Sequence, residues 1–314
     1  MSGSAITGRF IRKSLRGRRP SFGRGRFVAL GASFALFPAC ARRAGRSVSI
    51  GAKDFTEELV LGELYAQMLE AHGFHVTRKF NLGGTQVAME ALLRGDIDLY
   101  PEYTGTALLS ILHRPPIRNA AVLYRTVKHA YKERYSLTWL APAPFDDTQA
   151  LATTRAVSAR YGIRTLSETA KAAPQLRLGA IPEFTTRPDG LPGLQKAYGG
   201  FHFKDVKLFD IGLKYTALES GGVDVVVAFG TDGQIEYDHL QLLVDDKHFW
   251  PSYQVSPVVR DGTLAALPQL APILNRIAPF LTDAVMRRLN GQVDREKMDP
   301  ADAARAFLQA HRLV

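Results

Sequence analysis

Apolar and polar positions follow two different periods along this chain, and the change of period predicts where strands and helices lie. Residues 47–52 alternate as in a half-buried strand, and residues 74–82 and 97–100 repeat that pattern. A helix between the first two strands is predicted by apolar residues at helical spacing, namely Val60, Leu61, Leu64, Tyr65, Met68 and Ala71. A second helix is predicted over 86–94. Strands alternating with helices in this way predict right-handed βαβ units and a mainly parallel sheet.

The stretch from Leu99 to Thr106 reads Leu-Tyr-Pro-Glu-Tyr-Thr-Gly-Thr. We expect Pro101 to end the third strand, because proline has no N–H to donate to a sheet and restricts the residue before it. The polar and aromatic residues that follow would then face a cleft at the carboxyl end of a strand, where ligands of α/β sheets commonly bind: Glu102, Tyr103, Thr104 and Thr106. Taken alone, the stretch fits an ordinary turn from strand to helix equally well.

The end of the first strand is also polar. Asp54 is predicted to cap the following helix, with Glu57 completing a capping box. Lys53 places a cation at the carboxyl end of the strand, beside a helix start, where it can meet a ligand carboxylate. A solvated lysine is the alternative.

The second half of the chain predicts another α/β region. An extended segment through 145–152 is expected to cross into a second domain, and the chain is expected to return through 250–257. Three strands are predicted in the second domain, at 176–181, 206–211 and 223–229. Three helical stretches are expected to pack onto the first domain, at 270–281, 283–290 and 300–313.

Composition and charge narrow the class of protein. The chain has 314 residues, 46% of them hydrophobic and 22% charged, which argues against global disorder. Its net charge of +10 suggests a nucleic-acid partner, but residues 1–40 hold eight Arg and Lys and no acid. The rest carries 32 basic against 30 acidic residues. A nucleic-acid binder keeps its basic surface on the folded domain, so that class is excluded.

Residues 1–46 have the layout of an export signal and a basic spacer: a basic beginning, an apolar run over 27–39 and small residues at its end. Cleavage after Ala39-Cys40-Ala41 and a lipoprotein box at Phe37-Pro38-Ala39-Cys40 both remain open, the second leaving Cys40 lipidated. Arg18-Arg19 also leaves a twin-arginine route open beside the general one. Cys40 is the only cysteine, so no disulfide within the chain is available.

Three pieces of sequence occur in an order that resembles a known family. They are Gly51-Ala52-Lys53-Asp54-Phe55-Thr56-Glu57, then Asn81-Leu82-Gly83-Gly84-Thr85, then Asp98-Leu99-Tyr100-Pro101-Glu102-Tyr103-Thr104-Gly105-Thr106. Together they resemble the substrate-binding proteins of glycine betaine/choline-type ABC importers. The resemblance implies a two-domain α/β periplasmic-binding-protein fold of type II, with the ligand in the interdomain cleft. Domain 1 would comprise 47–146 and 254–314, and domain 2 would comprise 147–253.

The resemblance also implies a set of binding residues. A quaternary ammonium group has no N–H to donate and is attracted to aromatic faces, whereas a carboxylate favours charged donors such as the arginine fork. Tyr103 and Tyr253 match cage tyrosines, and Asp147 matches an acid beside the cage. The carboxylate partners would be Lys53, Thr106 and Arg187.

Two positions depart from the family pattern. Gln149 stands where a cage tyrosine is expected, and Phe229 stands where another tyrosine is expected. The cage would therefore fall from four aromatic rings toward three. This predicts either weaker binding of betaine or a ligand with a polar group that Gln149 can hydrogen-bond.

The resemblance implies an exported, periplasmic and monomeric protein that captures a quaternary ammonium osmolyte, such as glycine betaine or choline, for the permease and ATPase of an ABC importer. An exported sensor for a different small zwitterion stays open. An enzyme on the same scaffold is a weak alternative, because the eight histidines show no metal-ligand spacing and no Gly-x-Ser-x-Gly occurs. We expect no cofactor and no metal.

Overall fold

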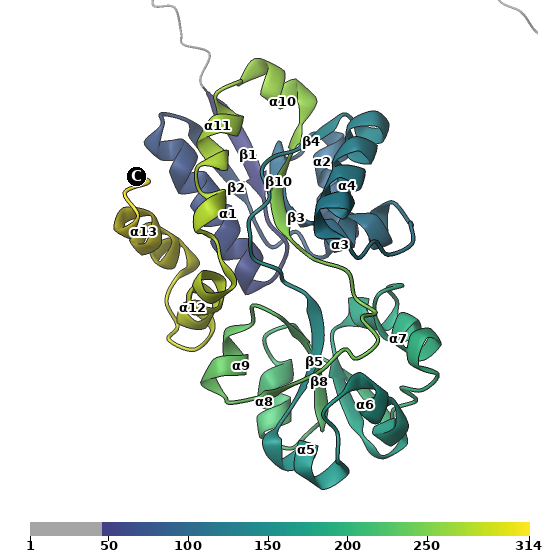
Figure 1. Ribbon diagram of the computed structural model, residues 1–314. Coiled ribbons are helices and arrows are strands. Elements are labelled where there is room, and N and C mark those ends of the chain that lie inside the picture. Colours follow the sequence, from purple (N-terminus) through teal and green to yellow (C-terminus); the bar gives the residue numbers. More distant parts are fainter. Residues whose placement is uncertain (1–45) are drawn as a thin grey trace, which may run out of the picture. The chain divides into compact units, whose positions relative to one another are not determined.

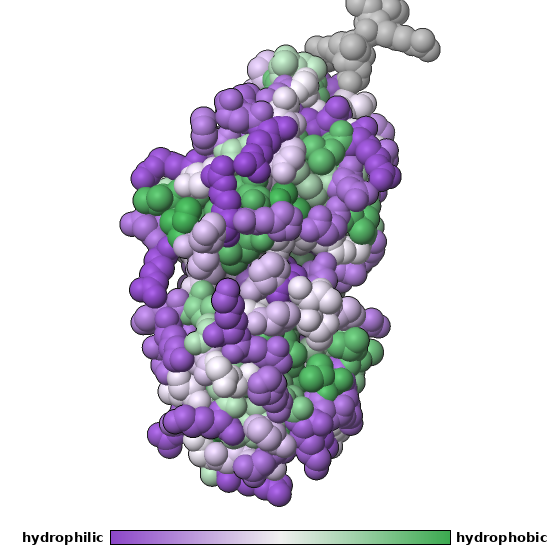
Figure 2. Space-filling model, turned by 90° about the vertical axis from the view of Figure 1, so that its right-hand side faces the viewer, coloured by the Kyte–Doolittle hydropathy of each residue, from purple (hydrophilic) through white to green (hydrophobic). Residues whose placement is uncertain are grey.

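The computed structural model describes residues 46–314. The export signal, the alternatives at Cys40 and the twin-arginine pair therefore lie outside the described residues. The described part is an α/β structure with two five-stranded sheets (Figure 1). In 46–314, no helix is both long and apolar enough to span a bilayer. The face shown in Figure 2 is mostly hydrophilic, with scattered hydrophobic patches.

The first sheet has the order β2-β1-β3-β10-β4. Its strands are β1 (Ser47–Gly51), β2 (His75–Lys79), β3 (Leu99–Tyr103), β4 (Leu137–Trp139) and β10 (Val255–Arg260). The first three are parallel to one another, but β10 runs antiparallel to both β3 and β4. Strand β4 therefore runs in the same direction as β1, β2 and β3, so the predicted mainly parallel sheet is confirmed. The sequence did not indicate the one reversed strand, β10, which enters from the second half of the chain and not through a βαβ crossover.

Pro101 does not end the third strand, contrary to the prediction. It lies within β3, opposite Pro257 of β10. The amide of Thr104 donates to Gln254 O, and hydrogen-bonded and non-bonded pairs alternate in an antiparallel ladder. The two prolines consequently form a non-bonded pair, where neither missing N–H removes a β3–β10 hydrogen bond.

Helices cover both faces of the first sheet (Figure 1). One group contains α1 (Thr56–Ala71), α11 (Leu270–Asn275), η4 (Ala278–Phe280), α12 (Asp283–Asp294) and α13 (Pro300–Ala310). The other contains α2 (Thr85–Arg94), α3 (Thr104–Thr106), the π-helical turn η1 (Ala107–Ile111) and α4 (Ala120–Tyr135), while α10 (Asp261–Ala266) follows β10. The C-terminal helices α11, α12 and α13 pack against α1, in agreement with the sequence prediction.

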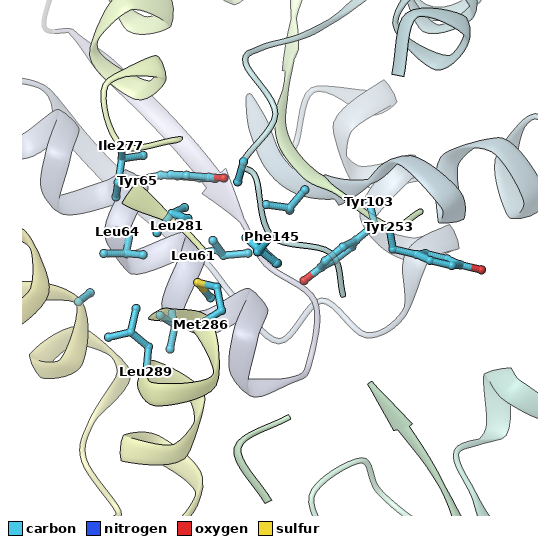
Figure 3. Packing of buried hydrophobic residues seen from close by; sticks show 14 of the residues in the cluster. Leu61, Leu64, Tyr65, Tyr103, Phe145, Tyr253, Ile277, Leu281, Met286 and Leu289 are labelled. Carbon is cyan, nitrogen blue, oxygen red and sulfur yellow. The ribbon is translucent and has the colours of Figure 1, made fainter. Parts of the chain in front are cut away.

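Helix α1 carries its apolar residues inward, but its start differs from the prediction. Leu61, Leu64 and Tyr65 are buried in the core that the C-terminal helices share (Figure 3). Ala71, in the last turn, is exposed. The capping residue is Phe55, which makes no side-chain cap, so the predicted capping box is wrong. Glu57 is buried instead of capping the helix.

The second sheet repeats the arrangement of the first. Its order is β7-β6-β8-β5-β9, from β5 (Gln149–Thr153), β6 (Arg177–Ala180), β7 (Asp205–Leu208), β8 (Val225–Phe229) and β9 (Gln241–Leu243). Strands β7, β6 and β8 are parallel, and β5 is antiparallel to β8 and β9. The helices are α5 (Arg155–Tyr161), α6 (Leu166–Ala172), η2 (Ala173–Gln175), η3 (Pro182–Thr185), α7 (Leu191–Tyr198), α8 (Lys214–Glu219) and α9 (Gly233–Tyr237).

Two segments connect the sheets. The first runs from β4 to β5 and the second from β9 to β10, and they meet in a bridge between Asp146 and Gln254. In each sheet, the strand that follows a connecting segment pairs with the strand that precedes the other segment. The domain boundaries at 146/147 and 253/254 stay a prediction.

Candidate functional site

A cavity of about 490 Å³ lies where segments from both sheets converge. All eight residues proposed from the sequence contribute to its lining: Lys53, Tyr103, Thr106, Asp147, Gln149, Arg187, Phe229 and Tyr253. Tyr103 ends β3, and Gln149 pairs with Phe229 across β5 and β8. The fold thus brings together predicted residues that are up to 200 positions apart in the sequence. Their contacts show which of them are available to a ligand.

Lys53 is already paired within the protein. Its Nζ lies 3.0 Å from Glu102 Oε1 and 3.4 Å from Glu58 Oε1, with all three side chains buried. Although burial lowers the pKa of Lys53, attraction to these two carboxylates raises it overall. Burial raises the pKa of Glu58 to about 8. Glu102 is therefore the main counterion of Lys53.

Two of the four residues predicted to face a cleft do not line the cavity. Glu102 is fully buried and accepts hydrogen bonds from the Tyr100 hydroxyl and the Tyr103 amide, both at 2.7 Å. The hydroxyl of Thr104 donates to Ser252 O at 3.2 Å. The expectation was wrong for these two because β3 continues through Pro101, which keeps Glu102 inside the sheet and leaves Tyr103 and Thr106 at its end.

Two lysines lie beside aromatic rings that line the cavity, although only Lys53 itself lines it. Lys53 Nζ lies 4.8 Å from the centroid of the Tyr103 ring, and Lys214 Nζ lies 5.2 Å from that of Phe229. A ligand cation could therefore contact these two rings only on a face that the lysine does not occupy. Tyr103 and Tyr253 lie at one end of the buried core in Figure 3. The Tyr103 hydroxyl donates to Glu57 Oε1 at 2.7 Å.

Arg187 has a partner that the sequence analysis did not name. Its Nε and Nη2 donate to the two carboxylate oxygens of Asp189, at 2.8 and 2.6 Å. Nη2 also lies 3.3 Å from the hydroxyl of Thr106, and Nη1 lies 3.8 Å from Glu183. One edge of the guanidinium is thus taken by Asp189. The edge that contains Nη1 is not held by that carboxylate.

Gln149 contacts the same carboxylate. Its Nε2 donates to Asp189 Oδ2 at 2.6 Å and lies 3.2 Å from the Tyr253 hydroxyl. The amide nitrogen must face Asp189, because a carboxylate can only accept hydrogen bonds from it. Among residues 46–314, nothing donates a hydrogen bond to the Oε1 of Gln149. Gln149 therefore presents an acceptor where the family pattern has an aromatic ring.

A buried acidic group lies behind Asp147. Thr231 Oγ1 lies 2.5 Å from Glu57 Oε2 and 2.6 Å from Asp147 Oδ1, and Asn290 donates to Glu57 at 2.9 Å. The threonine hydroxyl has one proton, so it cannot donate to both carboxylates at once. Burial raises the pKa of Glu57 to about 7, and burial together with Glu57 raises that of Asp147 well above its usual range.

Several lining residues were missed by the sequence analysis. They include three further aromatic rings, Phe55, Phe184 and Phe209, and the acids Glu183 and Asp210. The wall is consequently richer in aromatic rings than the predicted three. Phe55 stands inside the first family-like piece, and Asp189 stands two positions after Arg187. The sequence could therefore have indicated both residues as candidates.

A cleft formed by segments of two α/β sheets, lined by aromatic and charged side chains from both, defines a protein that binds a small solute. The chain belongs to the family described as the substrate binding domain of ABC-type glycine betaine transport systems, whose model matches residues 46–310. The sequence-based family, fold type and substrate-binding function are thereby confirmed.

Individual relatives agree with this membership. A glycine-betaine-binding protein of Pseudomonas aeruginosa is 35% identical over 279 residues, covering 85% of this chain and 89% of that protein. An ergothioneine transport permease/ergothioneine binding protein of Helicobacter pylori is 36% identical over 261 residues. The match covers 83% of this chain, but this chain spans only about half (47%) of that protein. A crystal structure of a glycine betaine/carnitine/choline ABC transporter shares 30% identity and a TM-score of 0.70, covering 86% of this chain and 99% of that one.

Proposed function

We propose that the cavity binds a small zwitterion with a quaternary ammonium group, and that the protein delivers it, outside the cytoplasm, to the permease and ATPase subunits of an ABC importer. The observation that carries the proposal is the meeting of Tyr103, Phe229 and Tyr253 with Arg187 in one cavity of about 490 Å³. Relatives named for glycine betaine and carnitine support the same ligand class.

The cationic end of the ligand lies among the aromatic rings in this proposal. A methylated ammonium gains roughly 0.5–2 kcal/mol from each ring face once water is excluded. Asp147 adds attraction to a positive charge when it is ionised. The two protein cations beside Tyr103 and Phe229 leave Tyr253 as the cage ring without a lysine close to its face within residues 46–314.

The carboxylate end lies against Arg187. A charge-assisted hydrogen bond from guanidinium to carboxylate is stronger than a neutral one, and its planar geometry fixes the direction of the bound group. Thr106 is close enough to Arg187 to add its hydroxyl. Lys53 contributes less than the sequence suggested, since Glu102 and Glu58 already hold its ammonium group.

A second candidate ligand carries a hydrogen-bond donor besides its quaternary ammonium group. The observation that favours it is the Oε1 of Gln149, which needs an N–H or O–H partner. Glycine betaine has no such donor. A relative named as an ergothioneine-binding protein makes a larger betaine with ring N–H groups one member of this class.

We also propose how the rest of the chain serves this function. Residues 1–46 act as the export signal and basic spacer, and use of the lipoprotein box would anchor the protein through Cys40. Domain 1 (47–146 and 254–314) and domain 2 (147–253) close on the ligand about the two connecting segments, as hinge proteins do. The protein acts as a monomer and as a binding protein without catalysis.

A thermal-shift panel on the purified protein tests the proposal. Glycine betaine, carnitine, choline and ergothioneine are compared with glycine, an unmethylated control. We expect at least one methylated compound to raise Tm and glycine to leave it unchanged. The Tyr253→Leu variant should lose most of that increase, whereas Tyr161→Leu, outside the cavity, should retain it. No shift with any methylated compound would contradict the proposal.

A further inference from the structure

Asp189 occupies a special place beside the cavity. It lies in the loop between η3 and α7, and it is 1% exposed. Its Oδ1 accepts from Arg187 Nε at 2.8 Å. Its Oδ2 accepts three hydrogen bonds, from Arg187 Nη2, Gln149 Nε2 and the Tyr253 hydroxyl, each at 2.6 Å. One buried carboxylate thus connects the residue proposed for the carboxylate end with a residue proposed for the cationic end.

We propose that Asp189 is a positioning residue that fixes the two ends of the ligand site relative to each other. This inference rests on the proposed function. Asp189 holds one edge of the Arg187 fork, so that the remaining edge presents Nη1 to a ligand carboxylate. Through Oδ2 it also holds the hydroxyl of Tyr253, so that the ring keeps its direction beside the ligand cation.

The loop is also held by contacts that do not involve the carboxylate. The indole Nε1 of Trp250 donates to the backbone oxygen of Asp189 at 2.8 Å, and the amide of Gly190 donates to Arg187 O at 3.0 Å. A Cβ at Gly190 would lie 2.1 Å from the Phe184 backbone oxygen, which shows how closely the loop packs. Backbone contacts and packing therefore also hold the loop, while the carboxylate of Asp189 accepts from four donor atoms of three residues.

The charge of Asp189 is consistent with this use. It neutralises Arg187 without covering the whole guanidinium, because only Nε and Nη2 contact it. A buried guanidinium without such a partner would be costly and would have no fixed orientation. With the partner, recognition of a zwitterion depends on the direction of the fork and the ring rather than on excess charge.

The test compares two ligands with one variant. Asp189→Asn keeps the shape of the side chain but removes its charge and one acceptor. Calorimetric titration with glycine betaine, which has both ends, and choline, which lacks the carboxylate, gives two affinities. We expect betaine affinity to fall about tenfold or more and choline affinity only about threefold, because choline depends on Tyr253 but not on Arg187.

Asp224→Asn is the matched control, because Asp224 is also a buried carboxylate that accepts from an arginine fork, that of Arg177, but it does not line the cavity. It should change the ratio of the two affinities by less than twofold. Equal losses of affinity for both ligands in Asp189→Asn would overturn the inference. Tighter binding of betaine would also overturn it, because it would show that Asp189 only neutralises Arg187. If the wild-type protein binds neither of these ligands, the inference is overturned, and the proposed function fails with it only if carnitine and ergothioneine do not bind either.

A second variant covers the case in which Asp189→Asn does not fold. Tyr253→Phe keeps the ring and removes the hydroxyl, which donates to Asp189 at 2.6 Å and accepts from Gln149 Nε2 at 3.2 Å. We expect choline affinity to fall about threefold, since the ring loses its fixed direction. Unchanged choline affinity would overturn the connection between Asp189 and the cationic end. In the Asp189→Asn background the same change should add little, because the two substitutions break one contact.

Discussion

Lys53 and Arg187 line the same cavity, yet they meet very different surroundings. The ammonium group of Lys53 lies between the buried carboxylates of Glu58 and Glu102, and its side chain is 4% exposed. Arg187 shares one edge with Asp189 and keeps 18% of its side chain exposed. A positive charge at a cavity is therefore not enough to bind an anion. The cation must also keep donors that its own protein has not used.

The sequence analysis proposed both residues as carboxylate partners, and this difference indicates separate roles for them. Lys53 stabilises the end of β1 and lies beside the Tyr103 ring, so it shapes the cavity. In the proposed function, Arg187 offers the edge with Nη1 to a ligand carboxylate. If the comparison is right, substitutions at Lys53 should act mainly on folding stability, and substitutions at Arg187 should act mainly on ligand affinity.

The largest effect is expected from Lys53→Met. Removing the ammonium leaves Glu102 buried without its counterion, which should lower the free energy of unfolding by about 3–5 kcal/mol. Urea denaturation measures it. Lys132→Met is the control, because Lys132 pairs with Asp261 while 55% exposed and should lose at most about 1 kcal/mol. Equally small losses of stability in the two variants would show that Lys53 contributes no more to folding than the exposed Lys132.

The next effect is a pH dependence that Glu57 brings to folding. The pKa of Glu57 is about 7 in the folded protein, against an ordinary value of 4.5. Between pH 4.5 and pH 7, the folded state therefore holds a proton that the unfolded state has released. Stability should therefore be greatest below about pH 4.5 for this group and should fall as the pH rises to 7, by up to about 3 kcal/mol.

Glu57→Gln isolates that contribution, because glutamine cannot titrate. Urea denaturation from pH 5 to pH 8 should show a smaller fall in stability for the variant than for the wild type. Glu90→Gln, on the exposed surface of α2, should follow the wild type. Parallel curves for Glu57→Gln and the wild type would show that Glu57 does not carry the proton.

Arg187→Lys should have a slightly smaller effect, on binding. The charge stays, but the planar fork is lost, so glycine betaine affinity should fall by about 1.5–3 kcal/mol. Choline affinity should change by less than about threefold. Calorimetry with both ligands measures this, with Arg94→Lys as an exposed control. Unchanged betaine affinity would remove Arg187 from the site.

The smallest effect is expected from Gln149→Tyr. A new ring adds roughly 0.5–2 kcal/mol of cation–π attraction, but the variant loses the amide bond to Asp189, worth about 1 kcal/mol. Glycine betaine affinity should therefore change by less than about fivefold. A ligand with a donor for Gln149 should lose more than that. Comparing glycine betaine with ergothioneine distinguishes the two candidate ligands, and a large loss for both would show that Gln149 mainly holds Asp189.

Most of the site was predictable from the sequence because its residues follow strand ends and stand in long, ordered family-like pieces. Tyr103 and Phe229 end β3 and β8, and Lys53 follows the end of β1 by two residues. The antiparallel partner of β3 was not predictable, because β10 lies about 150 residues away. Without that partner, Pro101 had to be interpreted as the end of a strand.

The partners of the charged groups could not be predicted from the sequence either. Periodicity indicates which face of a helix is apolar, but Glu57 and Glu58 are buried at the start of α1 against residues from distant segments. Whether a lysine faces solvent or two carboxylates depends on such long-range contacts. Asp189 is the exception, since its nearness to Arg187 in sequence could have suggested their pairing.

The central claim is that the cavity recognises a methylated ammonium group, and one pair of titrations tests it most directly. Glycine betaine and glycine have the same carboxylate and differ only in the three methyl groups on nitrogen. Calorimetric titration of the purified wild-type protein should show that glycine betaine binds at one site and at least about tenfold more tightly than glycine. Equal affinity for the two, or tighter binding of glycine, would contradict the account.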